Sequence, residues 1–370
     1  MSQKPSKVLM LLGMYDPNMH RGIAKAAKEW GWHLDINMMK TFRLPERWTG
    51  DGIICSLNSE RRLAEYILNS KVPCVDLSIW RSDLPIHRVV ADNRRIGMLA
   101  ADHLSTYGHK HFAWYAYDRT PFGDERFRGY RERLAKVGLN PERLDGRGAH
   151  RIDVVLQRLR KLSRPCAIFA KSDLDASWIM SACLQEGYRV PEDFAILGVD
   201  NNELICELLP TALSSVSQNQ ELIGYRGANV LQSLMTGKRI SQKTHFVEPG
   251  GVEVRQSTDA IAVEDIIVRQ TLETMNAKYR HDIEIGQLAA QAGIHRNQLE
   301  ARFKKTMHTT IHQKLIEIRI AKASELLKES LLSVEDIAVL TGFCHAPHLS
   351  RVFKTRRGIS PLHYRKSFSR

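Results

Sequence analysis

Two short segments near the C-terminal end carry side chains suited to reading base pairs in DNA. In the first, Leu299 and Phe303 are spaced four residues apart, as on one face of a helix. The residues left on its outer side are His295, Arg296, Asn297, Glu300 and Lys304. In the second, Leu349 and Phe353 have the same spacing. Its outer residues are His345, Ala346, Ser350, Arg351 and Lys354. Arginine pairs with guanine, asparagine with adenine and glutamate with cytosine in the major groove, so we predict two recognition helices. The solvated face of an ordinary helical domain is the alternative.

Both segments belong to an internal repeat. The first copy consists of Ile285, Leu288, Ala289, Gly293, Ile294, Leu299 and Phe303. The second copy consists of Val334, Ile337, Ala338, Gly342, Phe343, Leu349 and Phe353. In each copy an i, i+3, i+4 stripe predicts a first helix, and the glycine allows a sharp turn into the second. We therefore predict two helix-turn-helix units, joined by one helix from Thr310 to Leu327.

Positive charge is concentrated in the same part of the chain. Residues 266–370 contain 18 Lys and Arg against 9 Asp and Glu, which accounts for +9 of the total formal charge of +13. A basic surface confined to one terminal segment indicates a polyanionic partner such as double-stranded DNA. A solvated basic surface without a partner is again the alternative.

Other chemistry has little support in the sequence. Cys344, His345 and His348 lack a fourth ligand for a metal ion, and the G-x-x-x-x-G-K-[ST], G-x-G-x-x-G and G-x-S-x-G motifs do not occur. We therefore expect no metal, no cofactor and no enzymatic activity. The six cysteines are scattered without a C-x-x-C pair, which favours reduced thiols in the cytoplasm. No apolar run approaches the roughly 18 residues that span a membrane.

The N-terminal 250 residues alternate short apolar runs with stretches of helical spacing. The runs are Val8–Leu12, Gly52–Cys55, Val72–Leu77, Arg88–Ala91, Phe112–Ala116, Cys166–Ala170, Phe194–Val199 and Ala212–Val216. Continuous apolar strands alternating with helices are typical of parallel sheets covered on both faces, and this length favours two lobes. Only helical periodicity follows Ser257. We expect an α/β domain over residues 1–258, a linker over 259–265 and an all-α domain over 266–370.

The all-α domain resembles the DNA-binding domain of AraC/XylS-type transcription regulators. The residues that carry this likeness are Ile285-x2-Leu288-Ala289-x3-Gly293, Arg319-x2-Lys322-Ala323-x2-Leu326-Leu327, Ile337-Ala338-x3-Gly342-Phe343 and Phe353-Lys354-x3-Gly358-x-Ser360-Pro361-x2-Tyr364-Arg365. The likeness covers nearly the whole segment. It implies that both helix-turn-helix units bind DNA.

The α/β domain resembles the sugar-binding domain of lactose/galactose-repressor proteins, which share the periplasmic-binding-protein fold. The likeness rests on Val90-x-Asp92-Asn93-x3-Gly97, Arg126-x2-Gly129-Tyr130, Ala170-x2-Asp173-x2-Ala176, Ile196-Leu197-Gly198-Val199-Asp200-Asn201 and Ala212-Leu213-Ser214-Ser215-Val216. It implies a two-lobed sensor for a small sugar. The two resemblances together imply a pentose, D-xylose above all, as the effector.

The resemblance also implies which residues hold the sugar. Asp200 and Arg126 occupy ligand-contacting positions, Asp173 lies in a neighbouring loop, and Asp16 is the candidate from the first lobe. Each aspartate could instead cap a helix N-terminus. Arg126 could instead pair with a neighbouring acid, Asp124 or Glu125.

We therefore predict a periplasmic-binding-protein-like, two-lobed α/β sensor followed by an all-α domain with two helix-turn-helix units. The expected function is sugar-responsive transcription regulation, with activation of a pentose operon, in a homodimer that binds half-sites and could contact RNA polymerase. A sugar-binding module with a helical oligomerisation tail is the alternative. An enzyme that modifies sugars is a weaker one, because no nucleophile–base pair is evident.

Overall fold

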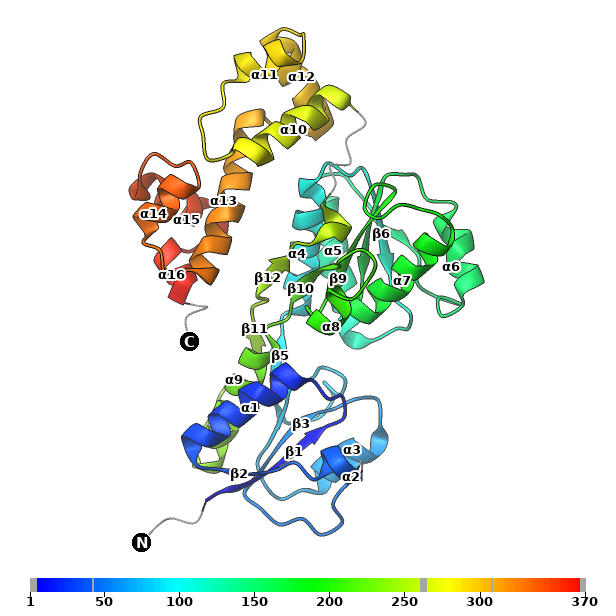
Figure 1. Cartoon of the computed structure of the whole chain (residues 1–370). Coiled ribbons are helices and arrows are strands. Elements are labelled where there is room, and N and C mark those ends of the chain that lie inside the picture. The colour runs from blue at the N-terminus through cyan, green and yellow to red at the C-terminus, as the bar shows by residue number, and fades with distance from the viewer. Residues whose placement is uncertain (1–4, 42, 260–264, 308, 367–370) are drawn as a thin grey trace. The chain divides into compact units, whose positions relative to one another are not determined.

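The computed structural model describes residues 5–41, 43–259, 265–307 and 309–366 (Figure 1). The chain divides into two compact units, Met1–Ala260 and Ile261–Arg370. In the described ranges no helix is both long and apolar enough to cross a membrane. The linker predicted over 259–265 remains a prediction, because residues 260–264 lie outside the described ranges.

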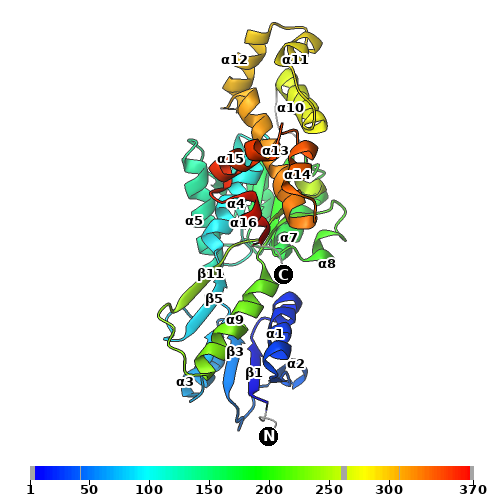
Figure 2. The same cartoon turned by 90° about the vertical axis from the view of Figure 1, so that its left-hand side faces the viewer.

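The first lobe of the N-terminal unit is a six-stranded parallel sheet with the order β11-β5-β4-β3-β1-β2. Its strands are β1 (Lys7–Leu12), β2 (His33–Asp35), β3 (Gly52–Ser56), β4 (Cys74–Asp76), β5 (His87–Ala91) and β11 (Thr244–Val247). Its helices are α1 (Pro17–Trp30), α2 (Met38–Thr41), α3 (Arg61–Asn69) and α9 (Gln220–Met235). Helices α1 and α9 lie side by side in both views (Figures 1 and 2).

The second lobe repeats this plan with the order β12-β10-β9-β8-β6-β7, in which β12 alone runs antiparallel to its neighbour. Its strands are β6 (His111–Tyr115), β7 (Glu142–Arg143), β8 (Cys166–Ala170), β9 (Phe194–Val199), β10 (Ser214–Ser217) and β12 (Gly251–Glu253). Its helices are α4 (Asn93–Thr106), α5 (Pro121–Ala135), α6 (Ile152–Leu159), α7 (Asp173–Gln185), α8 (Glu203–Cys206) and the 3-10 turn η1 (Gln256–Thr258).

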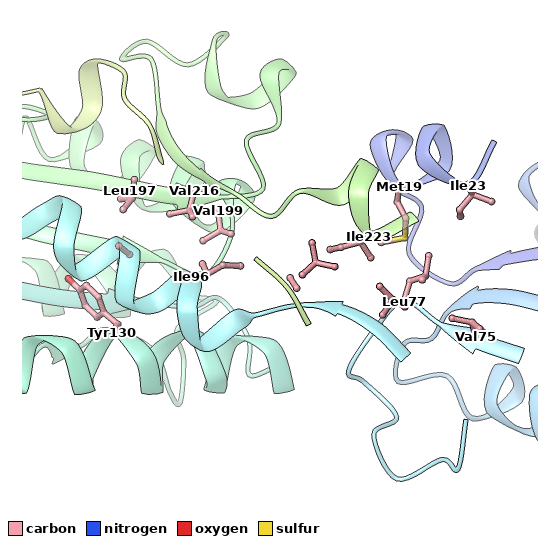
Figure 3. Packing of buried hydrophobic residues seen from close by; sticks show 14 of the residues in the cluster. Met19, Ile23, Val75, Leu77, Ile96, Tyr130, Leu197, Val199, Val216 and Ile223 are labelled. Atoms are coloured by element: carbon pink, nitrogen blue, oxygen red, sulfur yellow. The ribbon is translucent and has the colours of Figure 1, made fainter. Parts of the chain in front are cut away.

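The chain passes between the lobes three times, after β5, after β10 and after β11. One buried apolar cluster draws on both lobes: Met19 and Ile223 lie in the first, and Ile96 and Val199 in the second (Figure 3). Each crossing leaves the carboxyl end of a strand. In open parallel sheets, ligands bind beyond these carboxyl ends.

All eight predicted apolar runs form strands, which confirms the α/β prediction. The four strands that the sequence did not reveal are β2, β7, β11 and β12, and they are the outer strands of the two sheets. Outer strands are half exposed, so they need no continuous apolar run; β2 and β7 contain no fully buried residue.

The C-terminal unit contains seven helices in its described part: α10 (Ile266–Lys278), α11 (Ile285–Gln291), α12 (Arg296–Met307), α13 (Ile311–Glu329), α14 (Val334–Leu340), α15 (Ala346–Arg357) and α16 (Pro361–Lys366). Both predicted helix-turn-helix units are present, as α11–α12 and α14–α15. The helix predicted from Thr310 is α13, whose N-terminus is closed by a reciprocal capping box between Thr310 and Gln313. Two separate apolar cores lie along α13.

Candidate ligand cleft and nucleic-acid interface

Arg126 is a deeply buried charged residue of the predicted sugar site. It lies on α5 and is 2% exposed. Its Nε donates to Oδ1 of Asn93 at 2.9 Å, and its Nη1 donates to the carbonyl of Lys171. The guanidinium lies 4.9 Å from the ring centroid of Phe122. Burial lowers the pKa of Arg126, and the nearby charge of Asp200 raises it.

The alternative role for Arg126, an ion pair with a neighbouring acid, is wrong. Asp124 pairs with Arg119 at 3.0 Å, and Glu125 pairs with Arg128 at 2.8 Å. Both of these pairs are exposed on the outside of the molecule, whereas Arg126 points inward.

Two glycines hold Arg126 in place by allowing α4 and α5 to approach closely. A Cβ on Gly97 would lie 1.9 Å from the carbonyl oxygen of Arg126, and one on Gly129 would lie 1.9 Å from that of Arg94. No other residue type fits at either position, because a real Cβ atom would overlap the facing backbone. This approach brings Asn93, at the start of α4, within reach of the guanidinium.

Asp200 follows β9 directly and faces the same site. Its φ of 118° is unusual for a residue with a side chain, and such strain is typical of functional positions. Its backbone N–H donates to Val216, and its Oδ1 accepts from the side-chain amide of Gln218. Burial raises the pKa of Asp200, the charge of Arg126 lowers it, and the charges of Asp173 and Asp16 raise it. The charges of the other three residues predicted to hold the sugar thus all act on Asp200.

Asp173 is completely buried and is occupied by protein partners. Its Oδ1 accepts from the hydroxyl of Ser215 at 2.6 Å, and its Oδ2 accepts from the backbone N–H of Asn202 at 2.8 Å and from the Cys206 thiol at 3.3 Å. These bonds tie the loop after β9 to β10. The geometry thus favours a residue that positions Asp200 rather than one that touches a ligand.

Asp16 is the N-cap of α1, the alternative role weighed above. Its Oδ1 accepts from the backbone N–H of Met19 at 2.7 Å. Its charge nevertheless raises the pKa of Asp200, which belongs to the other lobe. Asp16 therefore caps its helix, and its charge also acts on Asp200.

Several further residues near Arg126 and Asp200 were not among those predicted to contact the sugar. The rings of Trp80, from the first lobe, and Phe122, from the second, have centroids 6.0 Å apart at 76°. Among the described residues, Nε1 of Trp80, Oδ1 of Asn201 and Oε1 of Gln220 are buried atoms without a hydrogen-bond partner. Buried polar groups are normally satisfied, so unpaired ones next to Asp200 and between the lobes suit a polar ligand. In the sequence, the position of Asn201 directly after Asp200 is a signal that could have found it.

The anchors of both recognition helices are fully buried, as predicted: Leu299, Phe303, Leu349 and Phe353 are each 0% exposed. On the outer side of α12, Asn297 and Lys304 are exposed, and Nε of Arg296 contacts Oε1 of Glu300 at 2.9 Å. On α15, Arg351 and Lys354 are exposed, whereas Ala346 and Ser350 are partly buried.

The predicted positions of the two histidines need a correction. Neither lies within its recognition helix, because α12 begins at Arg296 and α15 begins at Ala346. The Nδ1 atom of His345 accepts from the backbone N–H of His348 at 3.1 Å, so His345 is an N-cap. His295 directly precedes α12, and its backbone N–H donates to Gln298.

Comparisons with known proteins agree with both units. Residues 101–258 match the periplasmic binding protein-like domain family, and residues 288–367 match a helix-turn-helix domain family. The xylose operon regulatory protein of Haemophilus influenzae is 28% identical over 328 residues, which cover 85% of this chain and 84% of that protein. Its counterpart in Escherichia coli K12 is 26% identical over 368 residues, or 95% and 94% of the two chains. The solved structure of a xylose-binding transcription activator matches with a TM-score of 0.63 and 26% identity, covering all of both chains.

The fold, the helix-turn-helix pair and these matches define the chain as a sugar-responsive transcription regulator with a C-terminal DNA-binding domain of the AraC type. It is similar over nearly its whole length to the xylose operon regulatory proteins. The alternative of a sugar-binding module with a helical oligomerisation tail is not favoured.

Proposed function

We propose that the two-lobed sensor binds D-xylose and that lobe closure on the sugar changes how the helix-turn-helix units bind DNA. The protein activates a pentose catabolic operon, acts in the cytoplasm as a homodimer, contacts RNA polymerase at the promoter and is not an enzyme. Closure shifts the equilibrium because the closed form binds the sugar more tightly than the open form does. The relatives that span both units are named for xylose, which supports this choice of sugar.

The observation that carries the sugar site is the cluster of buried, partly unpaired polar groups. Asp200 offers a carboxylate, Arg126 a guanidinium, and Trp80 an N–H without a partner. Sugar hydroxyls both donate and accept, and the rings of Trp80 and Phe122 can lie against the apolar face of a sugar. One guanidinium, on Arg126, faces the three carboxylates of Asp16, Asp173 and Asp200. This charge balance suits a neutral ligand better than a phosphorylated one.

A thermal-shift series on the full chain tests the sensor. D-xylose should raise the melting temperature more than L-arabinose, D-ribose, D-glucose or xylose 5-phosphate, since ligand at a hundred times Kd stabilises by about 2.7 kcal/mol. Asp200→Ala and Arg126→Ala should abolish the xylose shift, and Arg128→Ala, two residues along the same helix, should not. A normal xylose response in both cleft variants would place the sugar elsewhere.

We propose that α12 and α15 read adjacent major grooves. Helix α13 has 19 residues and is therefore about 28 Å long, while successive major grooves on one face of DNA lie about 34 Å apart. The bases are read by Arg296, Asn297 and Glu300 in one groove and by Arg351 in the other. The phosphates are held by Lys304 and Lys354. His295, His345 and Ala346 contact DNA from the N-terminal ends of the two helices, and Ser350 contacts it from one turn inside α15.

Hydroxyl-radical footprinting on a duplex selected by the full chain tests this reading. Two protected segments about one turn apart are expected for each subunit, and a homodimer should double that pattern. A single protected segment per subunit would contradict it. Sedimentation of the complex with and without xylose gives the number of subunits.

A further inference from the structure

One arginine of α13 connects the two helix-turn-helix units. The Nε atom of Arg319 donates to the carbonyl of Tyr279 at 2.9 Å, and its Nη2 donates to the carbonyl of His281 at 2.9 Å. These two carbonyls lie at and just beyond the C-terminal end of α10, where helix carbonyls lack intrahelical partners. Arg319 therefore caps the helix that packs beneath the first unit.

The turn of the second unit meets the same point from the other side. Gly342, between α14 and α15, has a φ of +79°, and a Cβ there would lie 2.5 Å from the carbonyl oxygen of Tyr279 and 2.8 Å from Nε of Arg319. The turn thus packs directly on the capped carbonyl and on the guanidinium. Its counterpart in the first unit, Gly293, has a φ of +67° and no atom within 4 Å of such a Cβ.

Little else among the described residues joins the two units. The core of the first includes Ile318 and the core of the second includes Ile320, while the two cores share no side chain. Arg319 lies between these two residues on α13. The guanidinium is therefore placed where the two cores adjoin, and its two hydrogen bonds join parts of the domain that share no apolar core.

We propose that Arg319, together with Gly342, is a positioning residue that fixes the spacing and orientation of the two recognition helices. This inference rests on the proposed reading of two grooves, and it names the residue that matches the spacing of the recognition helices to the spacing of the grooves. Arg319 acts through Tyr279 and His281 and need not touch DNA. A lysine cannot replace it, because only the planar guanidinium donates to two carbonyls in fixed geometry.

The distance between the recognition helices provides a direct test that needs no DNA. Spin labels at Ala301→Cys on α12 and Thr355→Cys on α15 occupy exposed sites, in a full-length chain that also carries Cys344→Ser. The other five cysteines are buried. The labelled chain with Arg319 and Gly342 unchanged should give one narrow distribution of distances between the two spin labels. Arg319→Gln and Arg319→Lys should at least double its width.

Two matched controls separate this effect from a general loss of structure. Lys322 lies on the same helix in an exposed pair with Glu325, so Lys322→Gln should leave the distribution narrow. Gly342→Ala should broaden it, whereas Gly293→Ala, which has a similar positive φ but open space, should not. A distribution as narrow in Arg319→Gln and Gly342→Ala as in the parent chain would overturn the proposal.

A spacing series measures the consequence for DNA. In a duplex selected by the parent chain, two base pairs are inserted between the two protected segments. The parent chain should lose at least tenfold in affinity, while Arg319→Gln should lose less than threefold relative to its own affinity for the unaltered duplex. Equal losses in both would contradict the positioning role. If the parent chain protects only one segment, the two-groove reading fails, yet the spin-label distances still decide whether Arg319 joins the units.

Discussion

The two helix-turn-helix units are built on the same apolar pattern, yet they differ in their helix ends and charges. Both bury their anchors completely, and both turn through a glycine with positive φ. The first helix of the second unit begins with a reciprocal capping box between Ser333 and Asp336. The corresponding helix of the first unit, α11, has Glu284 as its N-cap, and Glu284 makes no side-chain cap bond.

The recognition helices differ as well. Helices α12 and α15 each have four basic residues. Helix α12 also contains Glu300, which holds Arg296 in an ion pair, whereas α15 has no acid and has a proline at its start. The repeat therefore conserves the packing that makes each unit fold and varies the surface that meets DNA. We expect the second unit to contribute more of the affinity and the first to contribute more of the selectivity, because its arginine must leave Glu300 before it can pair with a base.

Substitutions of the two anchor phenylalanines should have the largest effects on stability, and the two effects should be equal. Phe303→Ala and Phe353→Ala should each lower the free energy of unfolding of the C-terminal unit by about 3–5 kcal/mol, as buried phenylalanines do. Urea denaturation measures this, and Leu331→Ala, at a 99% exposed position, is the control. Hydrogen exchange should show the loss of protection first in the unit that carries the change. A marked inequality would mean that the cores are not equivalent.

Substitutions of Arg351 and Arg296 should have the next largest effects, on DNA-binding free energy, and the two effects should be unequal. Arg351→Ala should cost about 1–3 kcal/mol of DNA-binding free energy if it reads a base, with loss of preference at its own base pairs. Arg296→Ala should cost less DNA-binding free energy. In the unchanged protein Arg296 must first break its ion pair with Glu300, which offsets part of what it gains from a base, whereas the variant has no such pair to break. Footprints of the two variants should change at positions about one turn apart. Changes at the same base pairs would show that the units do not read separate grooves.

Helix capping should differ between the units by a smaller amount. Ser333→Ala removes a side-chain cap and should lower the free energy of unfolding by about 1 kcal/mol. Glu284→Ala removes no cap bond and should change it by only a few tenths of a kcal/mol. Thermal unfolding of both variants in parallel measures the difference, and equal losses would refute the structural distinction between the two helix starts.

The lysines should give the smallest and most uniform effects. Lys304→Gln and Lys354→Gln should each weaken binding to all duplexes alike and reduce the slope of log affinity against log salt by about 1. Binding measured at several salt concentrations on selected and random duplexes checks this. A change confined to the selected duplex would instead assign the lysine to base reading.

The sequence alone determined what depends on local spacing and on burial. The eight inner strands were evident because burial on both faces demands continuous apolar residues. The repeated anchors were evident because a helix face requires a fixed period. The resemblances then pointed to Arg126 and Asp200, whose charges act on each other in the structure.

Only the tertiary structure decided which residues meet across long distances in the chain. Trp80 of the first lobe faces Phe122 of the second, and Gln218 meets Asp200 because β9 and β10 end side by side. Neither contact leaves a local pattern in the sequence. The outer strands could not be predicted from the sequence, because a half-exposed strand does not need a continuous run of apolar residues. Arg319 showed the same limit: its residue type suited a helix surface, and its function became visible only when the carbonyls of α10 and the turn at Gly342 were brought together, since such contacts depend on packing rather than on spacing.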